Sequence, residues 1–75
     1  MTYNKLQTIL PNDELHYLSD VISDQPEYSS DLHDYILFEY TIEYWTDTLN
    51  RLDNAGINYS IMSDPHLPEL QYILV

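Results

Sequence analysis

Apolar residues recur at helical spacing through the middle of the sequence. From Tyr35 to Leu52 they are separated by steps of three and four residues. Because an α-helix turns by about 100° per residue, such steps place side chains on one stripe. The stripe consists of Tyr35, Phe38, Ile42, Trp45, Leu49 and Leu52. The spacing predicts one long central helix over about residues 31–54, which begins after the N-cap Ser30 and ends at a left-handed Gly56.

A β-strand is the alternative for the first half of this stretch. Residues 35–45 are rich in aromatic and β-branched side chains, and polar side chains alternate with them at Glu39, Thr41 and Glu43. In that case a strand at 35–45 is followed by a short helix at 47–55. The single helix is preferred because the stripe stays in phase throughout and neither Gly nor Pro interrupts it.

The flanking segments predict a mixed α+β fold. Residues 2–10 form a short helix or an ordered arm, and a short N-terminal helix follows over about 12–23. Apolar and polar residues then alternate over 57–62, as in a half-buried strand, and a second apolar run occupies 70–75. Turn-forming residues separate these two runs. The segments therefore predict a C-terminal antiparallel β-hairpin that packs on the long helix.

The composition indicates one small folded domain over residues 1–75. Apolar residues make up 44% of the chain, which includes eight Tyr and one Trp, more than a disordered chain contains. There is no cysteine, which fits a reducing compartment and excludes a disulfide framework. No uncharged apolar run approaches the roughly 18 residues that a membrane-spanning helix needs. We therefore expect a cytoplasmic protein without membrane contact, located in the host cytoplasm if it is phage-encoded.

The acidity of the chain is its most unusual property. Thirteen carboxylates face only Lys5 and Arg51, and the net charge is −11. Few of these carboxylates can be paired within the chain, so the fold carries uncompensated repulsion. Direct binding of nucleic acid is excluded, because neutralising phosphates requires clustered Lys and Arg side chains.

The sequence contains no recognisable catalytic or metal-binding motif. A single Gly cannot build a glycine-rich phosphate loop, and without Cys the strongest nucleophile is missing. The three His residues fall at no known ligand spacing. We therefore expect a protein that is not an enzyme and that uses neither a cofactor nor a metal ion.

The predicted long helix carries a row of carboxylates. Glu39, Glu43 and Asp47 follow one another at i, i+4 and i+8, so that neighbours lie about 6 Å apart. Such a row resembles the phosphates of one nucleic-acid strand. The alternative interpretation is a solvated face of an acidic protein.

Aromatic residues lie beside this row. In the predicted helix, the side chains of Tyr40 and Tyr44 project roughly opposite the Phe38/Trp45 stripe and form a second apolar side. There they either contact another element or anchor a partner. Asp34 adds a carboxylate in the first turn. The candidate partner-binding residues are therefore Glu39, Tyr40, Glu43, Tyr44, Asp47 and Asp34.

Small size, high acidity and many tyrosines are shared in a general way by phage-encoded DNA-mimic inhibitors, such as anti-CRISPR, anti-restriction and uracil-DNA glycosylase inhibitors. The likeness is one of composition and assigns no role to any residue. It suggests an inhibitor that blocks the DNA site of a basic, nucleic-acid-binding host protein. The alternative is an acidic immunity or antitoxin-like protein that neutralises a basic toxin.

The apolar tail at 72–75, if it forms an edge strand, favours a weak homodimer.

Overall fold

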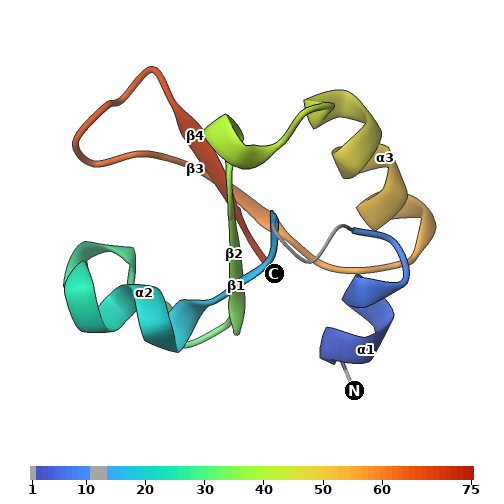
Figure 1. Ribbon diagram of the computed structural model, residues 1–75, viewed down its shortest axis with the longest axis horizontal. Coiled ribbons are helices and arrows are strands. Elements are labelled where there is room, and N and C mark those ends of the chain that lie inside the picture. The colour runs from blue at the N-terminus through green and yellow to red at the C-terminus, as the bar shows by residue number, and fades with distance from the viewer. Residues whose placement is uncertain (1, 11–13) are drawn as a thin grey trace.

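The structure is a computed structural model that describes residues 2–10 and 14–75. A four-stranded antiparallel sheet lies between two groups of helices (Figure 1). The elements in chain order are α1 (Thr2–Gln7), β1 (His16–Tyr17), α2 (Leu18–Asp24), η2 (Pro26–Tyr28), β2 (Tyr35–Phe38), η3 (Glu39–Thr41), α3 (Trp45–Asn54), β3 (Ser60–Ser63) and β4 (Gln71–Leu74).

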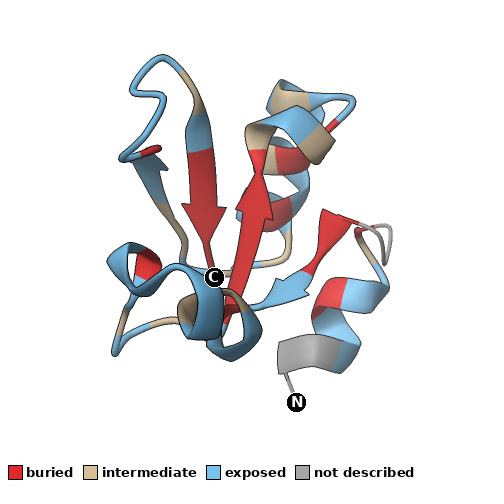
Figure 2. Ribbon diagram, turned by 60° about the vertical axis from the view of Figure 1, so that its left-hand side comes forward, coloured by how far each residue is buried: buried red, intermediate tan, exposed pale blue. Residues whose placement is uncertain are grey.

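The strands are arranged in the order β1-β2-β4-β3, and each neighbouring pair is antiparallel. β4 pairs with β2 through Leu37 opposite Ile73, and with β3 through Ile61 opposite Ile73. The two central strands are almost entirely buried, whereas the outer strands β1 and β3 are largely exposed (Figure 2). The C-terminal segment therefore forms the middle of the sheet.

Each face of the sheet has its own apolar cluster, because successive side chains of a strand point to opposite faces. Leu37 and Ile73 pack against α1 and α3, where they meet Leu6 and Leu52. On the other face Ile36, Phe38, Tyr72 and Leu74 pack against Leu18 of α2 and Tyr28 of η2. Figure 1 shows α2 on one side of the strands and α1 and α3 on the other.

The predicted long helix over 31–54 is wrong. Tyr35–Phe38 form β2, and all four of its side chains are buried. A central strand that is covered on both faces appears in the sequence as a continuous apolar run, which a helical stripe also contains. The helix begins only at Trp45. The alternative of a strand at 35–45 and a helix at 47–55 comes closer, but the strand is shorter and η3 follows it.

The end of α3 matches its prediction. Gly56 adopts a left-handed conformation with φ +70°. Its N–H donates to the carbonyl of Asp53, and the N–H of Ile57 donates to the carbonyl of Leu52. These two bonds form the Schellman motif that closes many helices at a left-handed glycine.

In the described part of the chain, no helix has the length and apolar character needed to cross a bilayer.

The other predicted elements are present with different bounds. α2 begins at Leu18 rather than near residue 12, because His16 and Tyr17 pair with β2. Residues 12 and 13 of the predicted helix lie outside the described residues. β3 and β4 pair antiparallel, as expected for a hairpin, but β2 joins the other side of β4 and extends the sheet. The expectation of an edge strand at 72–75 is therefore wrong.

Candidate partner-binding surface

The candidate residues lie on a connection between elements rather than on one helix. Glu39 and Tyr40 belong to η3, Glu43 and Tyr44 to the segment before α3, and Asp47 to the first turn of α3. The row at i, i+4 and i+8 is therefore not formed. Of the two alternatives for the tyrosines, exposure rather than burial against another element is observed, since 68% of Tyr40 and 67% of Tyr44 remain accessible.

Glu39 extends the hydrogen bonding of the sheet. Its Oε2 accepts the backbone N–H of Gln71 at 2.6 Å. That N–H points toward the position where β2 would continue, but β2 ends at Phe38. The side chain of Glu39 therefore supplies the acceptor that a backbone carbonyl of a longer β2 would have supplied. Glu39 therefore acts as part of the fold, and its carboxylate is only partly available to a partner.

Asp47 is paired with one of the two basic residues. Its Oδ2 lies 2.9 Å from Nε of Arg51, one turn further along α3. Arg51 also donates from Nη1 to the carbonyl of Ile9 at 3.0 Å, so it connects α3 to the segment after α1. Both side chains of the pair are exposed, and such pairs contribute little to stability. Even so, Arg51 compensates the charge of Asp47.

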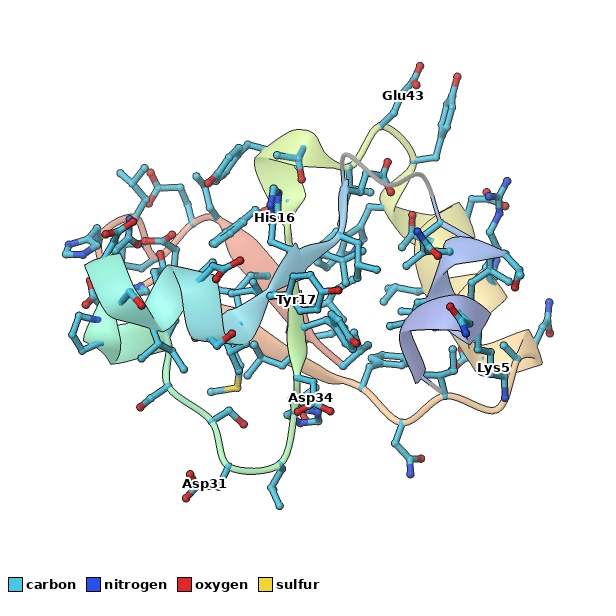
Figure 3. The ribbon with its side chains drawn as sticks, turned by 60° about the horizontal axis from the view of Figure 1, so that its bottom comes forward. Lys5, His16, Tyr17, Asp31, Asp34 and Glu43 are labelled. Atoms are coloured by element: carbon cyan, nitrogen blue, oxygen red, sulfur yellow. The ribbon has the colours of Figure 1, made fainter. Side chains whose placement is uncertain are left out.

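Asp34 lies away from the other candidates. It precedes β2, whereas Glu43 follows its far end, and Figure 3 shows the two side chains on opposite sides of the molecule. Its backbone is fixed, because its N–H donates to Val75 and its carbonyl accepts from Leu18. Asp34 and Glu43, which the sequence analysis placed on one helix, therefore do not share a surface.

A groove beside η3 adds residues that the sequence pattern did not single out. It has a volume of about 370 Å³ and lies between β1, α2 and η3. We call it the acidic groove, and its lining includes the side chains of His16, Tyr17, Asp20, Asp24, Phe38 and Tyr40. Its members come from two stretches of the chain, 16–24 and 38–40, that are far apart in the sequence, so no local spacing could have grouped them.

Aromatic rings and carboxylates meet in the acidic groove. The ring of Tyr40 stacks on Phe38, with centroids 5.2 Å apart and an interplanar angle of 21°. Asp20 and Asp24 are exposed and lie one turn apart on α2. Carboxylates next to an aromatic face suit the cationic side chains of Arg and Lys.

The charge of the surface is largely uncompensated. Arg51 is paired with Asp47, and Glu27 is bonded to His66, while Asp53 accepts the hydroxyl of Tyr59 and raises the pKa of that tyrosine. Within the described residues, the exposed carboxylates that have no hydrogen bond or ion pair are Asp20, Asp24, Asp31, Asp34, Glu43 and Glu69. The charges of these side chains are therefore not compensated by a partner within the described residues.

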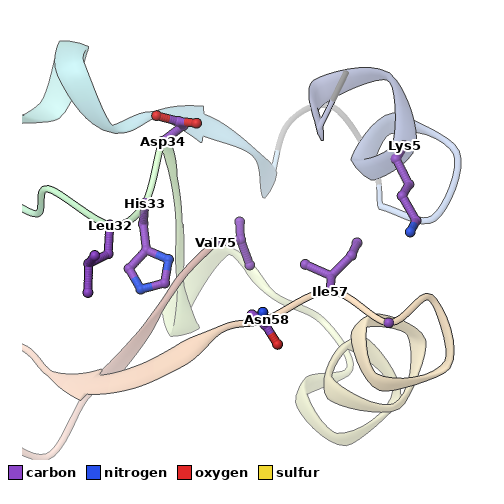
Figure 4. Close-up of a pocket in the computed structure, with 8 residues that line it drawn as sticks. Lys5, Leu32, His33, Asp34, Ile57, Asn58 and Val75 are labelled. Atoms are coloured by element: carbon purple, nitrogen blue, oxygen red, sulfur yellow. The ribbon is translucent and has the colours of Figure 1, made fainter.

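A second cavity contains Lys5. It has a volume of about 350 Å³, and Figure 4 shows Lys5 on one side and His33 and Asp34 on the other. His33 Nε2 lies 3.3 Å from the hydroxyl of Ser60. Among residues 2–10 and 14–75, no group of three or more His, Asp or Glu side chains is placed to hold a metal ion. The cavity therefore offers mixed charges without a metal-binding cluster.

Comparison with known proteins gives no relative to compare with this surface. No protein-family model, no curated protein and no solved structure matches the chain.

Proposed function

We propose that the protein is a non-enzymatic inhibitor that binds a basic, nucleic-acid-binding host protein and covers its DNA site. The observation that supports this most strongly is the set of exposed, uncompensated carboxylates next to exposed aromatic rings. We assign to the partner the acidic groove together with Glu43 and Tyr44, which follow the groove residue Tyr40 in the chain.

The chemistry of this surface complements a site for phosphate groups. DNA-binding proteins hold the backbone with Arg and Lys side chains, which also bind carboxylates and aromatic faces. Asp20 and Asp24 supply the charge, and the stacked ring of Tyr40 supplies a flat apolar contact. An opposite net charge on the partner would also accelerate encounter at low salt.

The partner is best identified by capture and then by competition. The immobilised protein is exposed to bacterial lysate at low salt, and captured proteins are identified by mass spectrometry. The proposal expects a protein with a nucleic-acid site, from which duplex DNA displaces the inhibitor. An immunity or antitoxin-like role would instead yield a basic toxin whose activity is blocked without competition from DNA.

Two matched charge reversals locate the contact. One variant combines Asp20→Lys with Asp24→Lys in the acidic groove. The control combines Asp31→Lys with Glu69→Lys, two exposed carboxylates outside the groove, and changes the net charge equally. The groove variant should lose at least about tenfold more affinity than the control, which corresponds to about 1.4 kcal/mol. Equal losses would mean that only the total charge matters, and would remove the groove from the proposal.

A further inference from the structure

The outer edge of β3 exposes backbone groups that a further strand could pair with. Tyr35 and Val75 exchange N–H···O bonds between β2 and the C-terminal end of β4. Because bonding directions alternate along a strand, Tyr72 and Leu74 must direct their groups to β3 instead. Their register partners there are Met62 and Ser60. The N–H and C=O groups of the intervening residues, Ile61 and Ser63, therefore point away from the sheet.

The side chains of β3 extend both apolar clusters to this edge. Ile61 lies opposite Ile73 on the α1/α3 face, and Met62 lies opposite Tyr72 on the α2 face. The helices do not cover them fully, since 40% of Ile61 and 47% of Met62 remain exposed. A strand added here would bury apolar area on both faces as well as satisfy the backbone.

Charge distinguishes this edge from the rest of the chain. The run from Asn54 to Ser63 has no charged side chain and is the longest such run in the sequence. The next carboxylate, Asp64, is buried and bonded to the hydroxyl of Tyr28. A second molecule with the same charge of −11 can therefore approach most closely along β3. The opposite edge offers less, because β1 has only two residues.

We propose that two copies of the chain associate by antiparallel pairing of β3 with its counterpart, giving a continuous eight-stranded sheet. A two-fold axis through the Ile61 pair sets Ser60 opposite Met62 of the second copy. The outward groups of Ile61 then bond to each other across the axis. This inference does not depend on the proposed function and concerns a different surface.

The dependence on salt separates the two proposals. Self-association brings together two chains of equal negative charge, so screening should strengthen it, whereas binding to a basic partner should weaken with salt. Sedimentation equilibrium at about 0.01 M and about 1 M ionic strength tests self-association directly. We expect a monomer–dimer equilibrium whose dissociation constant falls at the higher salt. Weak complexes have dissociation constants of up to about a millimolar. A protein that remains monomeric at both ionic strengths up to that concentration would overturn the inference.

Two variants test the register of the pair. Ile61→Lys places two like charges opposite each other at the axis, although it lowers the net negative charge of each copy. Leu67→Lys is the control, because Leu67 is also about half exposed but lies in the loop after β3. The first should raise the dimer dissociation constant at least about tenfold at high salt, and the second should leave it unchanged or lower it. Equal behaviour of the two variants would exclude β3 as the interface.

Amide hydrogen exchange provides a test without substitution. The N–H groups of Ser60 and Met62 are bonded to β4 and should exchange slowly at any concentration. Those of Ile61 and Ser63 should exchange rapidly in the monomer and become protected as the protein concentration rises at high salt. Concentration-independent exchange at these two amides in a sample that sedimentation shows to be dimeric would place the contact elsewhere.

Ser63→Pro, which removes one outward donor and leaves the bonds to β4, should weaken the dimer.

Discussion

The hydroxyl of Tyr28 donates a 2.6 Å hydrogen bond to Oδ2 of Asp64 and so connects η2 to the turn that follows β3. The other oxygen, Oδ1, accepts the N–H groups of His66 and Leu67 at 2.8 and 2.9 Å. Tyr28 and Asp64 are both buried. The bond from Tyr28, with these backbone donors, lowers the pKa of Asp64. Burial and the bond to this carboxylate raise the pKa of Tyr28.

Removing this hydroxyl should destabilise the fold in a manner that depends on pH. Tyr28→Phe should cost about 1 to 3 kcal/mol at neutral pH, since it deprives a buried carboxylate of a donor. The lowered pKa of Asp64 means that its contribution is complete above the ordinary value of 3.8 and is lost as the pH falls through the folded value. The difference between variant and wild type should therefore shrink in strong acid.

Urea unfolding followed by Trp45 fluorescence at several pH values measures this difference. Tyr40→Phe is the control, because it removes a hydroxyl from an exposed ring and should have little effect. A Tyr28→Phe difference that is constant down to the lowest pH would show that the stabilisation does not act through the ionised Asp64.

Truncation of the core between the sheet and α3 should strongly destabilise the protein. Leu52 is fully buried in the cluster that also contains Leu37 and Ile73. Leu52→Ala should cost about 2 to 5 kcal/mol through lost apolar contact and a residual cavity, a large part of the stability of a small domain. The same change at the half-exposed Leu67 should cost less than about 0.5 kcal/mol. Similar melting temperatures for the two variants would contradict the observed packing.

The role of Glu39 can be tested by separating its charge from its hydrogen bond. Glu39→Ala removes the acceptor of the Gln71 N–H and should cost about 0.5 to 1.5 kcal/mol. Glu39→Gln retains a carbonyl acceptor and should recover most of that loss. The exchange rate of the Gln71 amide reports the bond directly and should rise only in Glu39→Ala. If both variants raise it equally, the negative charge rather than the acceptor is needed.

The sequence predicts local features of this fold better than its long-range pairing. Gly56 ends α3 as expected, because a left-handed cap depends on residues close in the chain. The antiparallel pairing of β3 and β4 was also visible as two apolar runs around a turn. The mixed helix and sheet content follows from these same local signals.

The error at residues 35–44 has a physical cause. Tyr35 and Leu37 pack on one face of the sheet and Ile36 and Phe38 on the other, so the strand has no polar side to reveal it. Pairing of β2 with β1 and β4 connects segments that are far apart in the sequence, and such contacts override local preference. The acidic groove was missed for the same reason, since it exists only once β1, α2 and η3 are assembled.

Residues 40–44, in the connection before α3, should control how fast a basic partner binds and leaves. If Tyr40 or Tyr44 anchors a basic partner, replacing it by Ala should mainly accelerate dissociation, by a factor corresponding to about 2 kcal/mol. Glu43→Lys should instead slow association at low salt, and the effect should diminish as salt screens the charge. Asp47→Lys is unsuitable for this purpose because it would also disrupt the pair with Arg51.

Surface plasmon resonance with the captured partner at several salt concentrations separates the two rates. Unfolding curves of each variant are the control, because Tyr40 also covers part of Phe38. Glu69→Lys provides the matched reversal at an exposed carboxylate outside the proposed contact. If Glu43→Lys and Glu69→Lys slow association equally and neither tyrosine alters dissociation, this segment is a solvated face and the partner binds elsewhere.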